Sequence, residues 1–96
     1  MKTLKLILIF FGFLTFSSAW ANSPSSVATC VGCHGQNGVG MSDLFPNLAG
    51  QKKDYLIKQL TDFKSGLRQN PMMNPLAAQL TDKDIESIAK YYSGLK

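Results

Sequence analysis

The chain has 96 residues and a formal net charge of +4 at pH 7, and hydrophobic residues make up 45% of it. The charge is too small to indicate a nucleic-acid-binding protein, and the length allows one domain with a thin hydrophobic core. Two cysteines and one histidine are too few soft ligands for a four-ligand zinc site. Domains of this size are commonly stabilised by a metal, a crosslink or another bound group.

The first segment has the organisation of a secretory signal. Two lysines precede an apolar run over residues 6–16, and an Ala-Trp-Ala tripeptide ending at Ala21 matches the small-x-small cleavage pattern. An uncleaved anchor is the alternative, but the run is shorter than the roughly 20 residues that span a bilayer. We therefore predict a signal peptide over residues 1–21, a mature domain over 22–96 without a permanent membrane span, and export to the periplasm.

A predicted helix begins near Pro24, a residue type favoured at the first helical position, and continues into a Cys-x-x-Cys-His sequence. Its reactive residues are Cys30, Cys33 and His34. On a helix these three positions share one face, so both thiols and the imidazole point the same way. This pattern is the attachment signature of a c-type haem, in which the cysteines form thioethers with the haem vinyl groups and the histidine binds the iron.

Other interpretations of this pentapeptide fit the chain less well. A thioredoxin-like dithiol lies beside a βαβ pattern, and no strand-like alternation appears in the sequence. A structural disulfide would not require the adjacent histidine. One covalently bound haem c with its iron is therefore the predicted cofactor, and it would supply apolar surface and crosslinking to a small domain.

The middle of the chain alternates between irregular and helical patterns. Glycines and a proline over residues 35–50 predict a long loop, which could wrap one side of a haem. From about residue 53 to 67 apolar residues recur at helical spacing. They are Leu56, Leu60, Phe63 and Leu67.

The last third combines a proline-rich segment with a second long helix. Pro71 and Pro75 predict a stiff, non-helical segment between them. The last helix is expected to begin near Thr81, whose side chain can cap it, and to end at Gly94. With no strand pattern anywhere, the prediction is a small all-α domain of three or four helices.

An electron carrier usually keeps its haem iron coordinated on both sides, and without a second histidine the natural distal ligand is methionine. Met41 is close to His34 in sequence, so the opposite haem face would be difficult to reach from there. Met72 and Met73 lie far downstream, and either could approach from the distal side. Any of these methionines could instead be adaptable core filler.

Four segments together resemble the class I c-type cytochromes, most closely the small periplasmic mono-haem type and one half of the di-haem periplasmic cytochromes. They are the Cys-Val-Gly-Cys-His-Gly, Phe-Pro-Asn-Leu-Ala-Gly-Gln, Tyr-Leu-Ile-Lys-Gln-Leu and Leu-Thr-Asp sequences beginning at residues 30, 45, 55 and 80. The resemblance covers nearly all of the mature chain. It implies a class I cytochrome c fold, with helices wrapped around one haem.

The resemblance also implies roles for particular residues. The spacing to Leu80 selects Met73 as the distal iron ligand, with Met72 as the second choice. Pro46 would accept a hydrogen bond from Nδ1 of His34, which would fix the imidazole orientation; as a residue by itself it could equally be a loop breaker. Three further residues would pack against the haem, although their pattern also describes an ordinary core: Leu48, Leu60 and Phe63.

These predictions point to a periplasmic electron-transfer protein with redox proteins as partners, such as respiratory complexes or periplasmic oxidoreductases, and not to an enzyme. The alternatives are an open-site haem protein that acts as an enzyme or gas sensor, and a haem subunit of a larger oxidase or dehydrogenase. Five basic residues between positions 52 and 68 are either a solvated helix face or a docking surface for an acidic partner.

Overall fold

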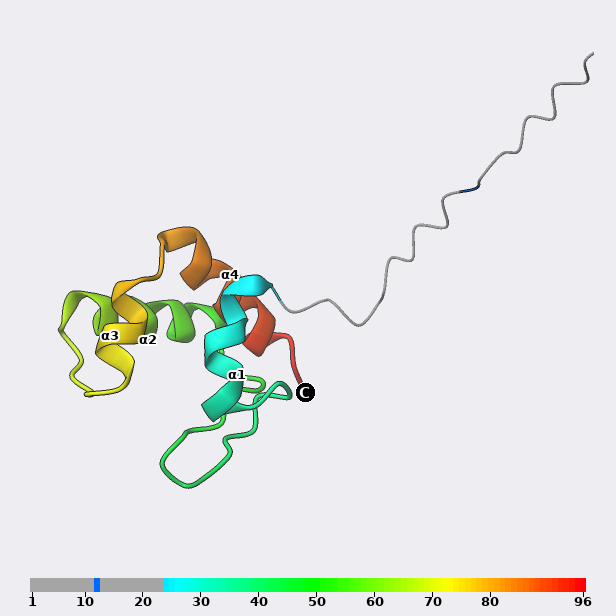
Figure 1. The fold of residues 1–96 in the computed structure, drawn as a ribbon, viewed down its shortest axis with the longest axis horizontal. Coiled ribbons are helices and arrows are strands. Elements are labelled where there is room, and N and C mark those ends of the chain that lie inside the picture. Colours follow the sequence, from blue (N-terminus) through cyan, green and yellow to red (C-terminus); the bar gives the residue numbers. More distant parts are fainter. Residues whose placement is uncertain (1–11, 13–23) are drawn as a thin grey trace, which may run out of the picture.

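The computed structural model describes Gly12 and residues 24–96. A short 3₁₀ turn and four helices follow one another in this part of the chain, with no strand (Figure 1): η1 Ser25–Val27, α1 Ala28–His34, α2 Lys53–Ser65, α3 Met73–Ala78 and α4 Asp82–Ser93. The all-α prediction is therefore confirmed. The predicted cleavage site after Ala21 lies outside the described residues. None of the helices found in residues 24–96 is long and apolar enough to cross a bilayer.

The core forms where α4 packs against α2 and against the η1 turn. Val27 and Tyr92 are fully enclosed, and the apolar stripe of α4 meets that of α2 through Ile88, Leu56 and Leu60. Figure 1 shows α3 against one end of α2, while α1 lies with α4 near the C-terminus. Burial of these side chains removes apolar surface from water, which is the main force that holds the helices together.

The loop over residues 35–52 leaves the end of α1 and returns to α2 with a defined backbone path (Figure 1). The amide of Met41 donates to the carbonyl of Cys33 at 2.9 Å, and the amide of Leu48 donates to the carbonyl of Gly38 at 2.7 Å. Gly40 lies so close to the chain opposite that an added Cβ would be 1.8 Å from the carbonyl oxygen of Phe45. This close approach requires glycine at position 40. It folds the loop back on itself, so that residues 45–48 return toward α1.

The second helix ends earlier than the apolar repeat predicts. Gly66 adopts a left-handed conformation with φ of 85°, and the amide of Arg68 donates to the carbonyl of Asp62 at 3.1 Å. This glycine-based stop is a common helix C-terminus. Leu67, which the pattern assigned to the buried stripe, is 83% exposed because the chain has already turned away.

The prediction of a non-helical segment between Pro71 and Pro75 was wrong for its second half. Helix α3 begins at Met73, and Pro75 is the third residue of its first turn. Amides in the first turn of a helix have no partner within the helix, so a proline there costs no hydrogen bond. Proline spacing alone therefore could not exclude a helix at this position.

The predicted Thr81 cap is present at the start of α4, where it is part of a capping box. The Thr81 hydroxyl accepts from the amide of Asp84, and the Asp84 carboxylate accepts from the amide of Thr81 at 2.9 Å. That backbone hydrogen bond holds the pKa of the Asp84 carboxyl below its usual range. The carboxylate therefore stabilises the folded state above its ordinary pKa, and this contribution is lost as the pH falls through the lowered value.

Replacing Thr81 with alanine should lower the free energy of unfolding by about 1 kcal/mol, because the amide of Asp84 loses its acceptor. Thermal unfolding of the purified protein measures the change. Thr61→Ala is the matched control, since Thr61 is exposed within α2. Equal stability of the two variants would contradict a stabilising role for the cap.

Candidate functional site

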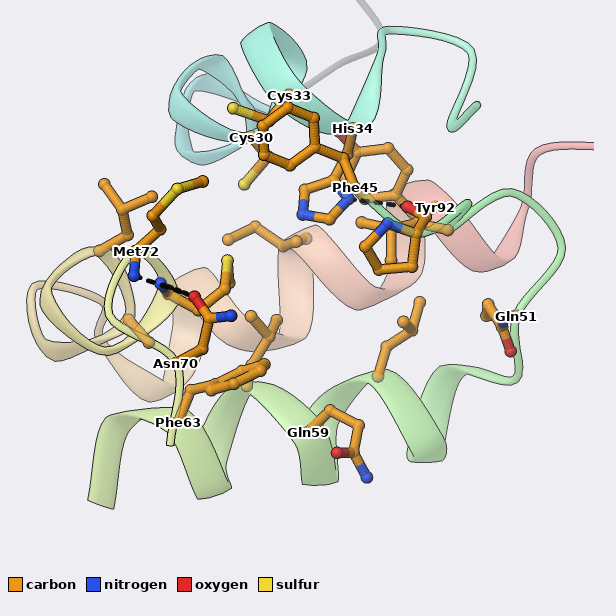
Figure 2. Close-up of a pocket in the computed structure, with 18 of the residues that line it drawn as sticks. Cys30, Cys33, His34, Phe45, Gln51, Gln59, Phe63, Asn70, Met72 and Tyr92 are labelled. Atoms are coloured by element: carbon orange, nitrogen blue, oxygen red, sulfur yellow. Dashed lines mark hydrogen bonds between the residues drawn. The ribbon is translucent and has the colours of Figure 1, made fainter. Parts of the chain in front are cut away.

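A cavity of about 310 Å³ opens between α1, the loop after it, α2 and α3, and its lining is mostly apolar. Figure 2 shows Cys30, Cys33 and His34 on the α1 side, with Met72 and Asn70 across the cavity on the α3 side. Helix α2 forms the wall between these sides. The chain thus brings together residues that are about forty positions apart in the sequence.

His34 is the last residue of α1, and only 8% of its surface is exposed. Its Nδ1–H donates to the carbonyl oxygen of Pro46 at 2.9 Å (Figure 2). This is the contact that the resemblance implied. The bond fixes the tautomer and the ring orientation, and it leaves Nε2 as the basic nitrogen available to a metal. The ring of Phe45 packs edge-on at a centroid distance of 6.4 Å and further restricts the imidazole.

Cys30 and Cys33 lie one helical turn apart, are partly buried and line the cavity. Neither forms a disulfide in the structure. Burial raises the pKa of the Cys30 thiol. Two thiols one turn apart beside an oriented imidazole match the three bonds by which a c-type haem is held.

Two tyrosines of α4 donate hydrogen bonds to the backbone directly after His34. The hydroxyl of Tyr92 donates to the carbonyl of Gly35 at 3.2 Å, and that of Tyr91 donates to the carbonyl of Gln36 at 2.5 Å. Tyr92 is fully buried, which raises the pKa of its phenol and keeps the donor protonated. No local spacing in the sequence indicates these hydroxyl bonds.

The three candidate methionines lie in different surroundings. Met41 is 69% exposed on the loop and is not one of the lining residues. Met72 is 50% exposed, whereas Met73 is partly buried against the hydrophobic core, and both line the cavity. The structure therefore brings the adjacent pair, and not Met41, to the side opposite His34.

All four residues named as haem-packing or haem-positioning line this cavity: Pro46, Leu48, Leu60 and Phe63. Sequence reasoning missed Arg68, which was grouped with the exposed basic residues. Its guanidinium lies 4.6 Å from the centroid of the Phe63 ring and donates to Oε1 of Gln59 at 2.7 Å. A stacked arginine of this kind belongs to the cavity wall, and no spacing pattern in the sequence distinguishes it from a solvated one.

The lining fits a haem on chemical grounds. The apolar side chains suit the macrocycle, and the thiols of Cys30 and Cys33 suit its vinyl groups. His34 has one ring nitrogen free to bind the iron, and the thioethers of Met72 and Met73 lie on the opposite side of the cavity. The polar side chains of Gln51 and Gln59 also line the cavity and suit the polar edge of a haem.

Comparison with known proteins agrees with this geometry. Residues 26–91 match the family model described as cytochrome C oxidase, cbb3-type, subunit III. The chain is 40% identical over 76 residues to cytochrome c-554(548) of Halomonas halodenitrificans, a match that covers 76% of this chain and 92% of the relative. The chain belongs to the class I c-type cytochromes. Its cofactor is accordingly a covalently bound haem c with iron, as Cys30, Cys33 and His34 indicate.

Other cytochrome relatives are longer than this chain. The crystal structure of reduced cytochrome c4 from Pseudomonas stutzeri superimposes with a TM-score of 0.64 at 49% identity, over 70% of this chain and 38% of that one. The thiosulfate dehydrogenase electron acceptor of Thiomonas intermedia is 39% identical over 80 residues, which is 82% of this chain and 37% of the relative. The chain thus corresponds to somewhat over a third of each, and the class I cytochrome c fold is confirmed.

Proposed function

We propose that this cytochrome is an exported one-electron carrier whose haem iron is bound by His34 and Met73. The main support is the apolar cavity, which brings two thiols and an oriented histidine opposite a methionine pair. Two axial ligands of this kind are typical of electron-transferring cytochromes c. Among the adjacent methionines, burial favours Met73, as does its spacing to the last helix.

In this function the bound haem supplies a reversible one-electron change at its iron. His34 contributes a neutral imidazole whose orientation is held by the Pro46 carbonyl, and this bond also increases the basicity of the ligating nitrogen. Met73 contributes a thioether, which favours the ferrous state and raises the reduction potential. The buried side chains of Leu60 and Phe63 exclude water from the site, so that the surroundings change little when the charge changes.

We place the carrier in the periplasm, with the signal peptide removed after Ala21 and the cytochrome domain over residues 22–96. The charged, apolar and small-residue regions of the N-terminal segment support this placement. Sequencing the N-terminus of the purified protein tests it: Asn22 is the expected first residue, and an intact Met1 in the membrane fraction would contradict it.

Redox proteins are the proposed partners, and the protein itself is proposed not to be an enzyme. The likeness to a thiosulfate dehydrogenase electron acceptor supports a partner that oxidises a substrate elsewhere. The match to a model of an oxidase subunit favours a second candidate, in which the domain is bound permanently in a larger complex. Co-purification from native membranes distinguishes the two.

The basic stretch of α2 gives limited support to electrostatic docking. Lys58 pairs with Asp62 at 2.6 Å and Lys53 with Glu86 at 3.5 Å, so part of the positive charge is neutralised within the chain. Exposed pairs of this kind are typical of a solvated helix face. We therefore do not assign partner recognition to these lysines.

Carbon monoxide binding to the reduced haem protein tests the carrier function against an open-site enzyme or sensor. With both axial positions held by the chain, binding should be slow and limited by detachment of the methionine. A redox titration should give one reversible one-electron transition. Fast, stoichiometric carbon monoxide binding by the unmodified protein would contradict the carrier proposal.

A further inference from the structure

The side chain of Asn74, in the first turn of α3, makes hydrogen bonds through both its oxygen and its nitrogen. Nδ2 donates to the carbonyl of Phe63 at 2.8 Å and to the carbonyl of Arg68 at 2.9 Å. Oδ1 accepts from the amide of Asn70 at 2.6 Å. One of these bonds joins the beginning of α3 to α2 at Phe63, and the other two join it to the segment between the helices at Arg68 and Asn70.

Asn70 completes this connection from the other side of the pair. Its Oδ1 accepts from the amides of both Met72 and Met73, each at 2.9 Å, and Figure 2 shows this contact beside the cavity. The backbone carbonyl of Asn70 accepts from the backbone amide of Asn74 at 3.0 Å. We call Asn70 and Asn74 the asparagine clasp. The side chain of Asn70 binds the backbone of the segment between the two residues, and the side chain of Asn74 binds the backbone of Asn70.

The clasp holds the backbone amides from which both methionine side chains project. Neighbouring residues on a helix point about 100° apart, because one turn contains about 3.6 residues. Met72 is the N-cap of α3 and Met73 is its first residue, so the two side chains leave the backbone in different directions and the orientation of this backbone selects which one faces the iron. Pro71 and Pro75 add stiffness on either side, but neither donates a hydrogen bond that would set this orientation.

We propose that the asparagine clasp is a positioning device that holds Met73 over the haem iron and limits both its detachment and its exchange with Met72. This inference rests on the proposed function, since it assumes that a methionine is the distal ligand. Asn74 acts through the carbonyls of Phe63 and Arg68, Asn70 acts through the methionine amides, and neither residue touches the iron.

The same substitution at the two positions provides a matched test, because the two side chains use different atoms. In Asn74→Asp a carboxylate replaces the amide donor and faces the carbonyl oxygens of Phe63 and Arg68, so two bonds are lost. In Asn70→Asp the accepting oxygen is kept, and a negative charge at the start of α3 is favourable. Asn70→Ala removes that acceptor and is the second informative variant.

The measurements are the weak near-infrared iron–sulfur band and the rate of carbon monoxide binding to the reduced haem protein. Loss of two of the clasp's hydrogen bonds should shift the equilibrium toward detached methionine by up to roughly ten-fold, because most of these bonds are exposed to solvent. Asn74→Asp and Asn70→Ala should weaken the band and speed carbon monoxide binding by about this factor, and Asn70→Asp should leave both unchanged. If Asn74→Asp does not fold, the comparison of Asn70→Ala with Asn70→Asp decides.

The outcomes separate this inference from the proposed function. If the unmodified protein shows the band and the Asn74→Asp and Asn70→Ala variants keep it at full strength, the clasp has no positioning role, while methionine ligation stands. Equal weakening in Asn70→Asp and Asn70→Ala would also overturn the proposal. If the unmodified protein lacks the band, methionine ligation fails and the clasp proposal fails with it.

Discussion

The double substitution Cys30→Ser, Cys33→Ser should abolish covalent haem attachment completely, since serine cannot form the thioethers to the vinyl groups. The measurement is haem absorbance that stays with the polypeptide after denaturation and extraction in acidified organic solvent. The unmodified chain should remain coloured and the double variant colourless. The amount of folded protein should also fall, because a domain this small would have to keep its apolar cavity without the crosslinked group.

Thr29→Ser provides the control for this prediction. Thr29 lies next to Cys30 and also lines the cavity, but it carries no thiol, so its variant should keep the haem. Retention of colour by the denatured double variant would show that the haem is attached elsewhere or not covalently.

Removal of the distal ligand should have the second large effect. In Met73→Ala the iron loses the thioether, so the reduction potential should fall by on the order of 0.1 V, within the roughly 0.8 V that axial ligands span. Carbon monoxide should then bind to the reduced protein without the delay of ligand detachment. Spectroelectrochemical titration and stopped-flow mixing measure the two changes.

Met72→Ala is the matched control, since the same residue type is removed from the neighbouring position on the cavity wall. It should leave the iron–sulfur band in place and change the potential little. Loss of the band in Met72→Ala alone would identify Met72 as the ligand, and loss in neither variant would contradict methionine ligation from this segment.

Local signals in the sequence were sufficient to predict helix α1 and the start of helix α4. The spacing of Cys30, Cys33 and His34 predicted a helix that presents three groups on one face, and α1 contains all three. The capping side chain of Thr81 predicted a helix start near this residue, and α4 begins at Asp82. Both succeed because a helix is set by contacts between residues a few positions apart.

Local rules failed where the chain turns. The apolar repeat extended to Leu67, but the left-handed Gly66 ended α2 before that residue could be buried. The proline pair suggested a non-helical segment, but α3 accommodates Pro75 in its first turn. In each case the helix boundary was set by a backbone angle or a hydrogen bond, and the apolar and proline patterns do not report either of them.

The sequence by itself determined the cofactor, because the cysteine and histidine spacing matches haem attachment without reference to the rest of the chain. It also determined the all-α class, through helical periodicity and the absence of strand-like alternation. Only the tertiary structure decided which groups surround that cofactor. Loop geometry brings the Pro46 carbonyl to His34, and the asparagine clasp brings the methionine pair to the opposite side. The His34–Pro46 and Asn74–Phe63 hydrogen bonds join residues 12 and 11 positions apart. Their distances follow from packing and backbone hydrogen bonding, which no local spacing encodes.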